Sequence, residues 1–266
     1  MKILSWKVSG QLAALAQRQI EAVLERDPDV LALQEISLGN YGDWCDALMG
    51  AGYSIVSAID LVGVPYPEMA PPIRRRYFNV IATRRPIAPL KGLTFEDPEQ
   101  LAVAFPEKYL AARVQVDGTP VEVHTADVPP SESLGLIKVH MLQAIRRRVD
   151  DSPDRPLVLC GDFMTPRSED ENSVTTWAGT HAKYNEEWEA AERSILEHPE
   201  FRDVYREKHE PGTRFPVSKY TRGTPHRYDH IYASAQLETV GCVYLGDWLT
   251  KKLSEHAPVE AELRLG

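Results

Sequence analysis

Apolar and polar positions along the first forty residues predict a strand, a helix and a second strand. Residues 2–8 alternate between polar and apolar side chains, which is typical of a strand. Residues 11–26 carry apolar side chains near helical spacing and predict an amphipathic helix. Residues 30–35 form a short apolar run, as in a buried strand. This order indicates two neighbouring strands joined by a crossover helix.

The rest of the chain continues the mixture of strands and helices. We expect an irregular proline-rich loop over 64–72, a connection without strong periodicity over 92–108, and a polar, irregular region over 168–226 with one helix near 186–196. No Gly/Ser linker divides the sequence, so we expect a single domain over residues 1–266. The remaining predicted elements are helices at 44–49 and 134–149 and strands at 53–58, 77–82, 111–116, 121–126, 156–160, 228–233, 239–245 and 258–265.

Composition limits the class of protein. Hydrophobic residues make up 43% and charged residues 26% of the chain, the ordinary balance of a globular protein. No run of eighteen apolar residues occurs, so we expect no transmembrane helix and no membrane partner. The N-terminus lacks the apolar region of a secretory signal. Cys45, Cys160 and Cys242 have neither metal-ligand spacing nor a disulfide framework, so we expect reduced thiols and a cytoplasmic location.

The charge distribution bears on the partner. The formal net charge is -9, which argues against a broad grip on a nucleic-acid backbone and makes nucleic acid an unlikely partner. Basic residues are nevertheless clustered at 74–76, 84–85 and 146–148. Such clusters are either ordinary solvated surface or the rim of a site for an anionic small molecule.

Acidic and imidazole side chains lie at the ends of several predicted strands. Glu35 closes one buried strand, Asp162 follows another, and Asp229 and the pair Glu255–His256 accompany two late strands. Side chains at the mouths of several strands can converge on one site. Carboxylates there could bind a hard divalent cation and activate water, and a histidine could contact a phosphate oxygen or move a proton. Each residue alone is more often a turn, cap or structural residue.

Five segments in order carry a resemblance to the endonuclease/exonuclease/phosphatase superfamily. Residues 3–10, ILSWKVSG, are similar to its opening ILSWNVNG, and residues 33–35 match its LQE motif. Residues 161–166, GDFMTP, resemble GDFNTP. Residues 227–231, RYDHI, resemble RIDHI, and residues 254–259, SEHAPV, resemble SDHAPV. The matches extend over almost the whole chain.

The resemblance implies an α/β fold in which two packed β-sheets are flanked by helices in four layers, with the site at the ends of the sheets. By the same resemblance, Glu35 matches the Mg²⁺ or Mn²⁺ ligand, and Asp162 matches the residue that orients or deprotonates the attacking water. His256 matches the residue that contacts the scissile phosphate, and Asp229 the residue that supports the site. Asn79, in a strand similar to the family's NGVAILSR, is a substrate-binding candidate.

Four positions depart from the family pattern. Lys7 stands where the family has an asparagine beside the metal, and Met164 where an asparagine holds the nucleophile or phosphate. Glu255 replaces an aspartate that pairs with the histidine or metal, and Asp127 replaces a histidine or tyrosine. We take Lys7 and Glu255 as catalytic candidates and Asp127 and Met164 as substrate-binding ones. The Lys7 ammonium is expected to pair with Glu35 and to substitute for the metal; a Lys7 that lost its proton would be a general base.

Three functions are compatible with this pattern. The leading hypothesis is a repurposed enzyme that uses the cleft for metal-independent acid–base chemistry on a small-molecule substrate, with no cofactor expected. The alternative is a Mg²⁺- or Mn²⁺-dependent phosphodiesterase or phosphatase with an unusual site. The third is a noncatalytic binding module. In every case general nuclease activity is expected to be weak or absent.

Overall fold

A computed structural model describes most of the chain and leaves nine segments undescribed. The described residues are 1–9, 13–62, 77–90, 105–130, 136–151, 154–166, 168–169, 175–176, 185–209 and 217–266. Within these ranges no helix is both long and apolar enough to cross a membrane.

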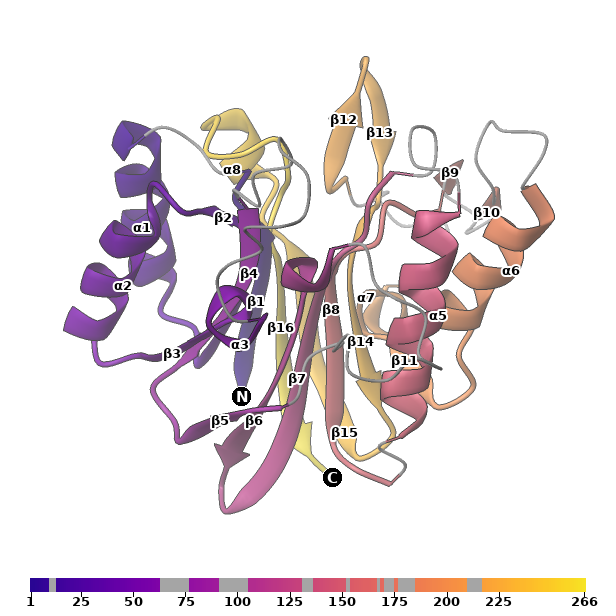
Figure 1. Ribbon diagram of the computed structural model, residues 1–266, viewed down its shortest axis with the longest axis horizontal. Coiled ribbons are helices and arrows are strands. Elements are labelled where there is room, and N and C mark those ends of the chain that lie inside the picture. Colours follow the sequence, from indigo (N-terminus) through magenta and orange to yellow (C-terminus); the bar gives the residue numbers. More distant parts are fainter. Residues whose placement is uncertain are drawn as a thin grey trace.

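The first of two large sheets is built from both ends of the chain (Figure 1). Strands β1 and β2 run parallel, and the other neighbouring strands of this sheet pair antiparallel. Helices α1 (Ala13–Arg26) and α2 (Tyr41–Gly50) cover its outer face, and the short α3 (Ala58–Val62) and α8 (Asp247–Thr250) join its strands. In spatial order the strands are β15 (Leu237–Tyr244), β16 (Val259–Leu265), β1 (Lys2–Lys7), β2 (Val30–Ser37), β4 (Tyr77–Thr83) and β3 (Ser54–Ser57).

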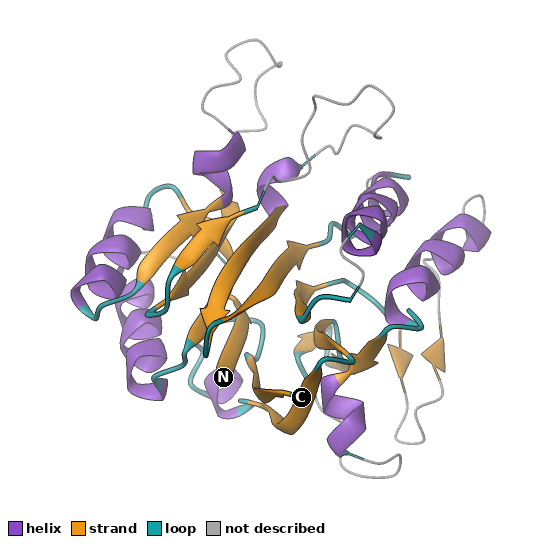
Figure 2. Ribbon diagram, turned by 90° about the horizontal axis from the view of Figure 1, so that it is seen from below, coloured by secondary structure: helices purple, strands orange, loops and turns teal. Residues whose placement is uncertain are grey.

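The second sheet also has six strands and faces the first. Helices α5 (Ile137–Asp150) and α6 (Asn185–Leu196) lie over its outer face (Figures 1 and 2). In spatial order its strands are β11 (Phe201–Asp203), β14 (Asp229–Ser234), β8 (Leu157–Asp162), β7 (Thr119–Asp127), β6 (Tyr109–Val116) and β5 (Ile87–Pro89). The smaller elements are the 3₁₀ turn η1 (Pro106–Lys108), helix α7 (Val204–Lys208), the pair β9 (Ser168–Glu169) and β10 (Thr175–Thr176), and the hairpin of β12 (Lys219–Thr221) and β13 (Thr224–His226).

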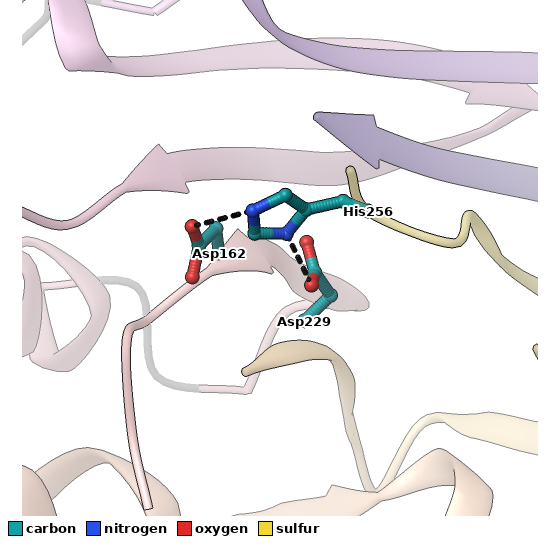
Figure 3. A group of neighbouring side chains, drawn as sticks. All are labelled: Asp162, Asp229 and His256. Carbon is teal, nitrogen blue, oxygen red and sulfur yellow. Dashed lines mark hydrogen bonds and ion pairs between the residues drawn. The ribbon is translucent and has the colours of Figure 1, made fainter. Parts of the chain in front are cut away.

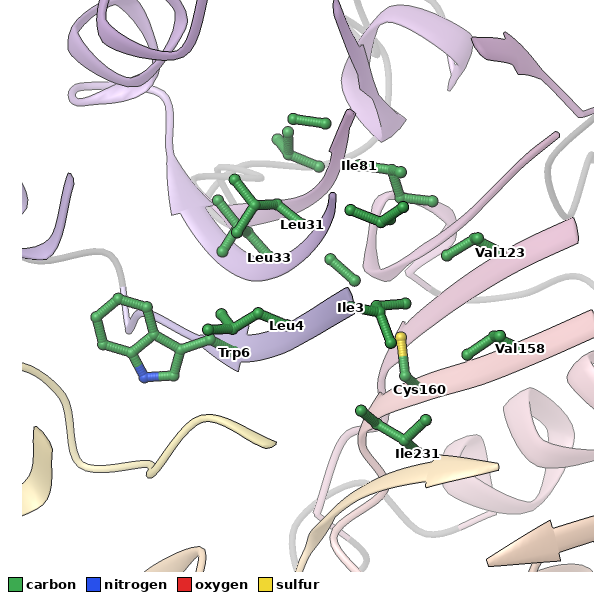
Figure 4. Packing of buried hydrophobic residues seen from close by; sticks show 14 of the residues in the cluster. Ile3, Leu4, Trp6, Leu31, Leu33, Ile81, Val123, Val158, Cys160 and Ile231 are labelled. Atoms are coloured by element: carbon green, nitrogen blue, oxygen red, sulfur yellow. The ribbon is translucent and has the colours of Figure 1, made fainter. Parts of the chain in front are cut away.

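The main core lies between the two sheets. Ile3 of β1 points toward Cys160 of β8, with Val123, Val158 and Ile231 around them (Figure 4). A second cluster packs α5 and α6 against the other face of the second sheet. These layers confirm the predicted two-sheet α/β architecture.

The structure corrects the sequence prediction mainly at short elements. Residues 105–108 were expected to belong to an irregular connection, but 106–108 form η1 and lead directly into β6. Within 168–226 the described residues include α7 and several two- or three-residue strands that were not predicted. Such elements are too short to produce a hydrophobic period, so tertiary contacts define them.

Gly161 is required where β8 passes β7. Its φ is +131°, and a Cβ at this position would lie 1.9 Å from the Ala126 carbonyl oxygen. We predict that Gly161→Ala destabilises the protein by at least about 3 kcal/mol, because both the backbone conformation and the packing forbid a side chain. Chemical denaturation measures the change. Gly42→Ala, at a helical position with nothing within 4 Å of the added Cβ, is the control and should be neutral or slightly stabilising.

Candidate active site at the ends of the two sheets

Strand register places three aspartates in one row at the edge of the second sheet. Asp162 of β8 pairs with Asp127 of the parallel strand β7 and with Asp229 of the antiparallel strand β14. Each of the three strands carries apolar core residues on this face and ends, or begins, with its aspartate. All three carboxylates are buried. The polar row therefore forms the rim of the core between the sheets.

A β-bulge brings Glu35 to the same rim. The pairing of β2 with β4 shifts between Leu33 and Ile36, so Gln34 and Glu35 together lie opposite one residue, Asn79. Glu35 has a φ of 59°, unusual for a residue with a side chain. Bulges re-aim a side chain at the end of a strand. Here the bulge leaves Gln34 buried and turns the Glu35 carboxylate toward Lys7.

The Lys7 ammonium lies between carboxylates from both sheets. Its Nζ is 2.8 Å from Asp127 Oδ1, 2.9 Å from Asp162 Oδ2 and 3.3 Å from Glu35 Oε1. An ammonium has three N–H donors, and the three carboxylates supply one acceptor each. The predicted pairing of Lys7 with Glu35 is confirmed, and Asp127 and Asp162 are further partners.

A second ammonium, Lys108 at the end of η1, was missed by sequence reasoning. Its Nζ donates to Asp127 Oδ2 and is 3.6 Å from Glu35 Oε1. Asp127 therefore bridges the two lysines, one through each oxygen. We call these five residues the lysine–carboxylate cluster: Lys7, Glu35, Lys108, Asp127 and Asp162.

The protonation states in the cluster follow from these contacts. Burial disfavours the charge of Lys7, but Asp127, Asp162 and Glu35 more than offset it and raise its pKa well above the usual value. Burial likewise opposes ionisation of Asp162, yet Lys7 and His256 lower its pKa to about 2. The pKa of Asp127 is lowered and that of Lys108 raised for the same reasons. The hypothesis of a neutral Lys7 that acts as a general base is therefore wrong.

His256 lies beside the cluster and is oriented by Asp229 (Figure 3). Its Nδ1 is 2.8 Å from Asp229 Oδ2, and its Nε2 is 3.9 Å from Asp162 Oδ2. Burial lowers the pKa of His256, but the charge and hydrogen bond of Asp229 outweigh burial, so the net shift is upward. Among the residues that the structure describes, none forms a hydrogen bond with the buried Nε2. A protonated His256 thus presents one unused N–H donor next to Asp162.

Contacts with β1 fix the segment that carries His256. The Ser254 hydroxyl donates to the Lys7 carbonyl at 2.7 Å and accepts from the His256 backbone N–H at 3.1 Å. The indole N–H of Trp6 donates to the His256 carbonyl at 2.9 Å. His256 and Lys7 are therefore held side by side, although 249 positions separate them.

Met164 and Asn79 act through contacts other than those expected. The Met164 side chain offers no amide, but its backbone N–H donates to Asp162 Oδ1 at 2.8 Å. Asn79 was expected to bind substrate, yet it is fully buried. Its amide donates to the carbonyl of Lys108 at 2.8 Å and to that of Thr125 at 3.2 Å. Asn79 therefore supports the backbone of Lys108 from inside the protein.

Glu255 does not join the site. It was expected beside His256, but its side chain is 76% exposed and 3.8 Å from Lys219 Nζ. The His256 side chain is fully buried, whereas the side chain of its neighbour Glu255 points to solvent.

In the parts of the chain that the structure describes, three arginines of these clusters pair with partly or fully exposed carboxylates, which favours ordinary solvated surface over the rim of a site. Arg84 pairs with Asp27, Arg85 with Asp117, and Arg146 with Asp150. The cluster at 74–76 lies outside the described residues.

The donor atoms around Glu35 fit an ammonium better than a divalent cation. Both Asp127 oxygens and the Glu35 Oε1 already face Lys7 or Lys108. A dication about 4 Å from one ammonium would meet repulsion of about 8 kcal/mol at an effective dielectric near 20. Candidate ligand atoms of Asp162, Asp229 and His256 also lie within 4.8 Å of one another. His256 Nδ1 and Asp229 Oδ2 already share a hydrogen bond, which a metal ion at either atom would have to break.

Solved structures share this fold over their full length. An AP endonuclease from Archaeoglobus fulgidus is 21% identical with a TM-score of 0.71, and the match covers 100% of both chains. The 3' phosphatase NExo from Neisseria, bound to a product DNA hairpin, is 22% identical with a TM-score of 0.67 and 99% coverage of each chain. TDP2 from D. rerio, complexed with a single-strand DNA product, is 15% identical with a TM-score of 0.66, covering 99% of this chain and 98% of its own. No curated protein sequence matches.

These neighbours correct one expectation from composition. The net charge of -9 was taken to make nucleic acid an unlikely partner, but two proteins with this fold were solved with DNA products. The expectation is wrong because net charge describes the whole surface, whereas substrate binding depends on the local charge at the site.

The sequence itself identifies the family. Residues 4–256 match the Endonuclease/Exonuclease/phosphatase family, and this range contains the complete lysine–carboxylate cluster together with Asp229 and His256. The chain belongs to the Endonuclease/Exonuclease/phosphatase family.

Proposed function

We propose that this chain is a phosphate-ester hydrolase in which two lysine ammoniums provide the positive charge that a divalent cation would otherwise supply. The observation that carries the proposal is the position of Lys7 Nζ, within 3.3 Å of Asp127, Asp162 and Glu35. Lys7 and Lys108 together offset two of the three carboxylate charges, as one divalent cation would.

The lysines prepare the site for an anionic substrate. Without them, the carboxylates of Glu35, Asp127 and Asp162 would repel a phosphate group. With them, Asp162 remains ionised and fixed, because Lys7 holds one oxygen and the Met164 N–H the other. Lys108 is a further point of contact, since its side chain is 19% exposed.

Asp162 and His256 would carry out the chemical step. Asp162 accepts a hydrogen bond from the attacking water, and His256 Nε2 donates to the leaving oxygen. The water oxygen bonds to phosphorus and the ester P–O bond breaks. The leaving oxygen departs with the proton of His256, and the proton that the water loses passes through Asp162 to solvent, from which His256 regains its own.

The proposed substrate is a phosphate ester, and DNA with modified ends or sites is among the first substrates to test. Two structural neighbours contain DNA products, and the family includes endonucleases, exonucleases and phosphatases. Small esters test the chemistry without the binding requirements of a long nucleic acid. The panel is therefore p-nitrophenyl phosphate, bis(p-nitrophenyl) phosphate, and DNA with an abasic site or a 3' phosphate.

We expect turnover of at least one of these substrates in excess EDTA, and Asp162→Asn should lower it at least about a hundredfold, because the water loses its acceptor. Asp247→Asn is the matched control, since Asp247 is exposed and pairs only locally with Lys251. Turnover that EDTA abolishes and Mg²⁺ or Mn²⁺ restores would contradict the proposal and favour the metal-dependent alternative. Tight phosphate-ester binding without turnover would favour the binding module.

A further inference from the structure

The loop after β8 holds a strained backbone at the residue that contacts Asp162. Met164 has a φ of 49°, a left-handed conformation that costs free energy for any residue with a Cβ. In this conformation its N–H donates to Asp162 Oδ1. The other oxygen, Oδ2, is left to face Lys7 and His256. The loop therefore determines which Asp162 oxygen is available at the site.

Two buried donors from different elements hold this loop. Lys138 Nζ donates to the Met164 carbonyl at 2.8 Å. His230 Nε2 lies 2.8 Å from the Thr165 carbonyl and must donate, because a carbonyl oxygen only accepts. Each of the two carbonyls that follow Phe163 is thus fixed by a side chain from another element, α5 or β14.

Lys138 occupies a position that is unfavourable for an ammonium. It is the second residue of α5, where the helix dipole disfavours positive charge, and its side chain is only 1% exposed. Glu192 of α6 compensates the charge at 2.6 Å. An apolar pair would fill this space between two helices at lower electrostatic cost. The feature that an apolar pair could not reproduce is the hydrogen bond to the Met164 carbonyl.

We propose that Lys138 is a positioning residue of the active site, which holds the 163–165 loop so that the Met164 N–H fixes the Asp162 carboxylate. Burial lowers the pKa of Lys138, and the charge and hydrogen bond of Glu192 oppose that shift and hold the Lys138 side chain in place. The family asparagine at position 164 is absent, and the backbone of Met164, held by Lys138, orients Asp162. The catalytic consequence rests on the proposed hydrolase function, whereas the loop geometry does not.

The double substitution Lys138→Met/Glu192→Leu separates this role from general stability. It removes both charges together and so leaves no unpaired ion, and it should fold with a stability near that of the natural protein. The Met164 carbonyl then has no side-chain donor. We expect the Met164 amide to exchange with solvent at least about fivefold faster by NMR, the factor that one ordinary hydrogen bond supports. The Leu159 amide, in the middle of β8, should be unchanged.

With substrate, the double variant should lose about tenfold to a hundredfold in kcat with little change in KM. Lys251→Met/Asp247→Leu, an exposed lysine–aspartate pair, is the matched control and should change neither quantity. Unaltered Met164 exchange in a folded double variant would overturn the proposal, as would an unaltered kcat. If the natural protein shows no turnover, faster Met164 exchange still supports the positioning role, and only the hydrolase function fails.

Should the double variant not fold, two single substitutions decide the question. Lys138→Met and Glu192→Gln each remove one charge of the pair, but only the first removes the donor to the Met164 carbonyl, since a methionine side chain has no N–H. Faster Met164 exchange in Lys138→Met alone supports the proposal. Equal exchange in the two variants would show that the ion pair acts only on stability.

Discussion

Lys7→Asn will make the folded protein dependent on a divalent cation. Removal of the ammonium leaves the buried Asp127 and Asp162 and the partly buried Glu35 without their shared partner. Lys108 still pairs with Asp127 and Glu35, and His256 lies beside Asp162. Loss of one partner from a buried ion pair costs about 3–5 kcal/mol. Asparagine contributes an oxygen ligand, so Mn²⁺ or Mg²⁺ can enter where the ammonium was. At a cation concentration about 100 times its Kd, roughly 2.7 kcal/mol of stability should return.

Thermal unfolding in EDTA and in increasing Mn²⁺ measures the loss of stability in Lys7→Asn and its recovery by the cation. Calorimetric titration measures the affinity for Mn²⁺. The natural protein should show no stabilisation by Mn²⁺, and Lys7→Asn should show a clear one. The double variant Lys7→Asn/Lys108→Gln should bind the cation more tightly still, because the second ammonium is gone. Hydrolysis should recover less than metal affinity, since Met164 still replaces the family asparagine.

Lys251→Asn controls for the substitution at an exposed lysine. Stoichiometric Mn²⁺ binding by the natural protein, lost in Glu35→Gln, would refute the substitution of the metal by Lys7.

The sequence predicts the fold because the strands have recognisable hydrophobic patterns. It predicts most of the candidate site because the polar residues of the site lie at the ends of these strands. Alternating or apolar segments predict β1, β2, β7, β8 and β14, and a polar residue at the end of such a strand lies at the rim of the core. Asp127, Asp162, Asp229 and Lys7 all obey this rule. The family resemblance then supplied their order and the identity of His256.

Lys108 could not be found in this way. It follows a connection without periodicity, and no family motif contains it. Its place depends on η1 and on the Asn79 amide, a contact between residues 29 positions apart. Asp127 is buried and pairs through its two oxygens with Lys7 and Lys108. The need for this second lysine follows from the burial of Asp127, which only the structure shows. The prediction that Glu255 lies in the site was wrong because the sequence does not give the side-chain direction in a short irregular segment. The packing of the neighbouring His256 sets that direction.

His256→Gln is expected to lower turnover about a hundredfold to ten-thousandfold while leaving the fold intact. Glutamine can still donate a hydrogen bond to a phosphate oxygen, but it cannot release a proton to the leaving group. The loss should therefore appear mainly in kcat and be smallest for p-nitrophenyl esters, whose leaving group needs little protonation. His140→Gln, in the outer groove between α5 and α6, is the matched control.

The pH dependence tests the role of Asp229 in the same step. A histidine whose pKa is raised stays protonated to higher pH, so the acid form of His256 should persist above the ordinary histidine range near 6.5 and turnover should fall only as pH rises through the raised pKa. Asp229→Asn removes the charge that raises this pKa, while burial continues to lower it. The alkaline limb of the kcat profile should therefore move to lower pH in Asp229→Asn, whereas a substrate with a p-nitrophenolate leaving group should show a weaker shift. An alkaline limb at the same pH in both proteins would show that His256 is not the proton donor, and its hydrogen bond to Asp229 would then serve only to orient it.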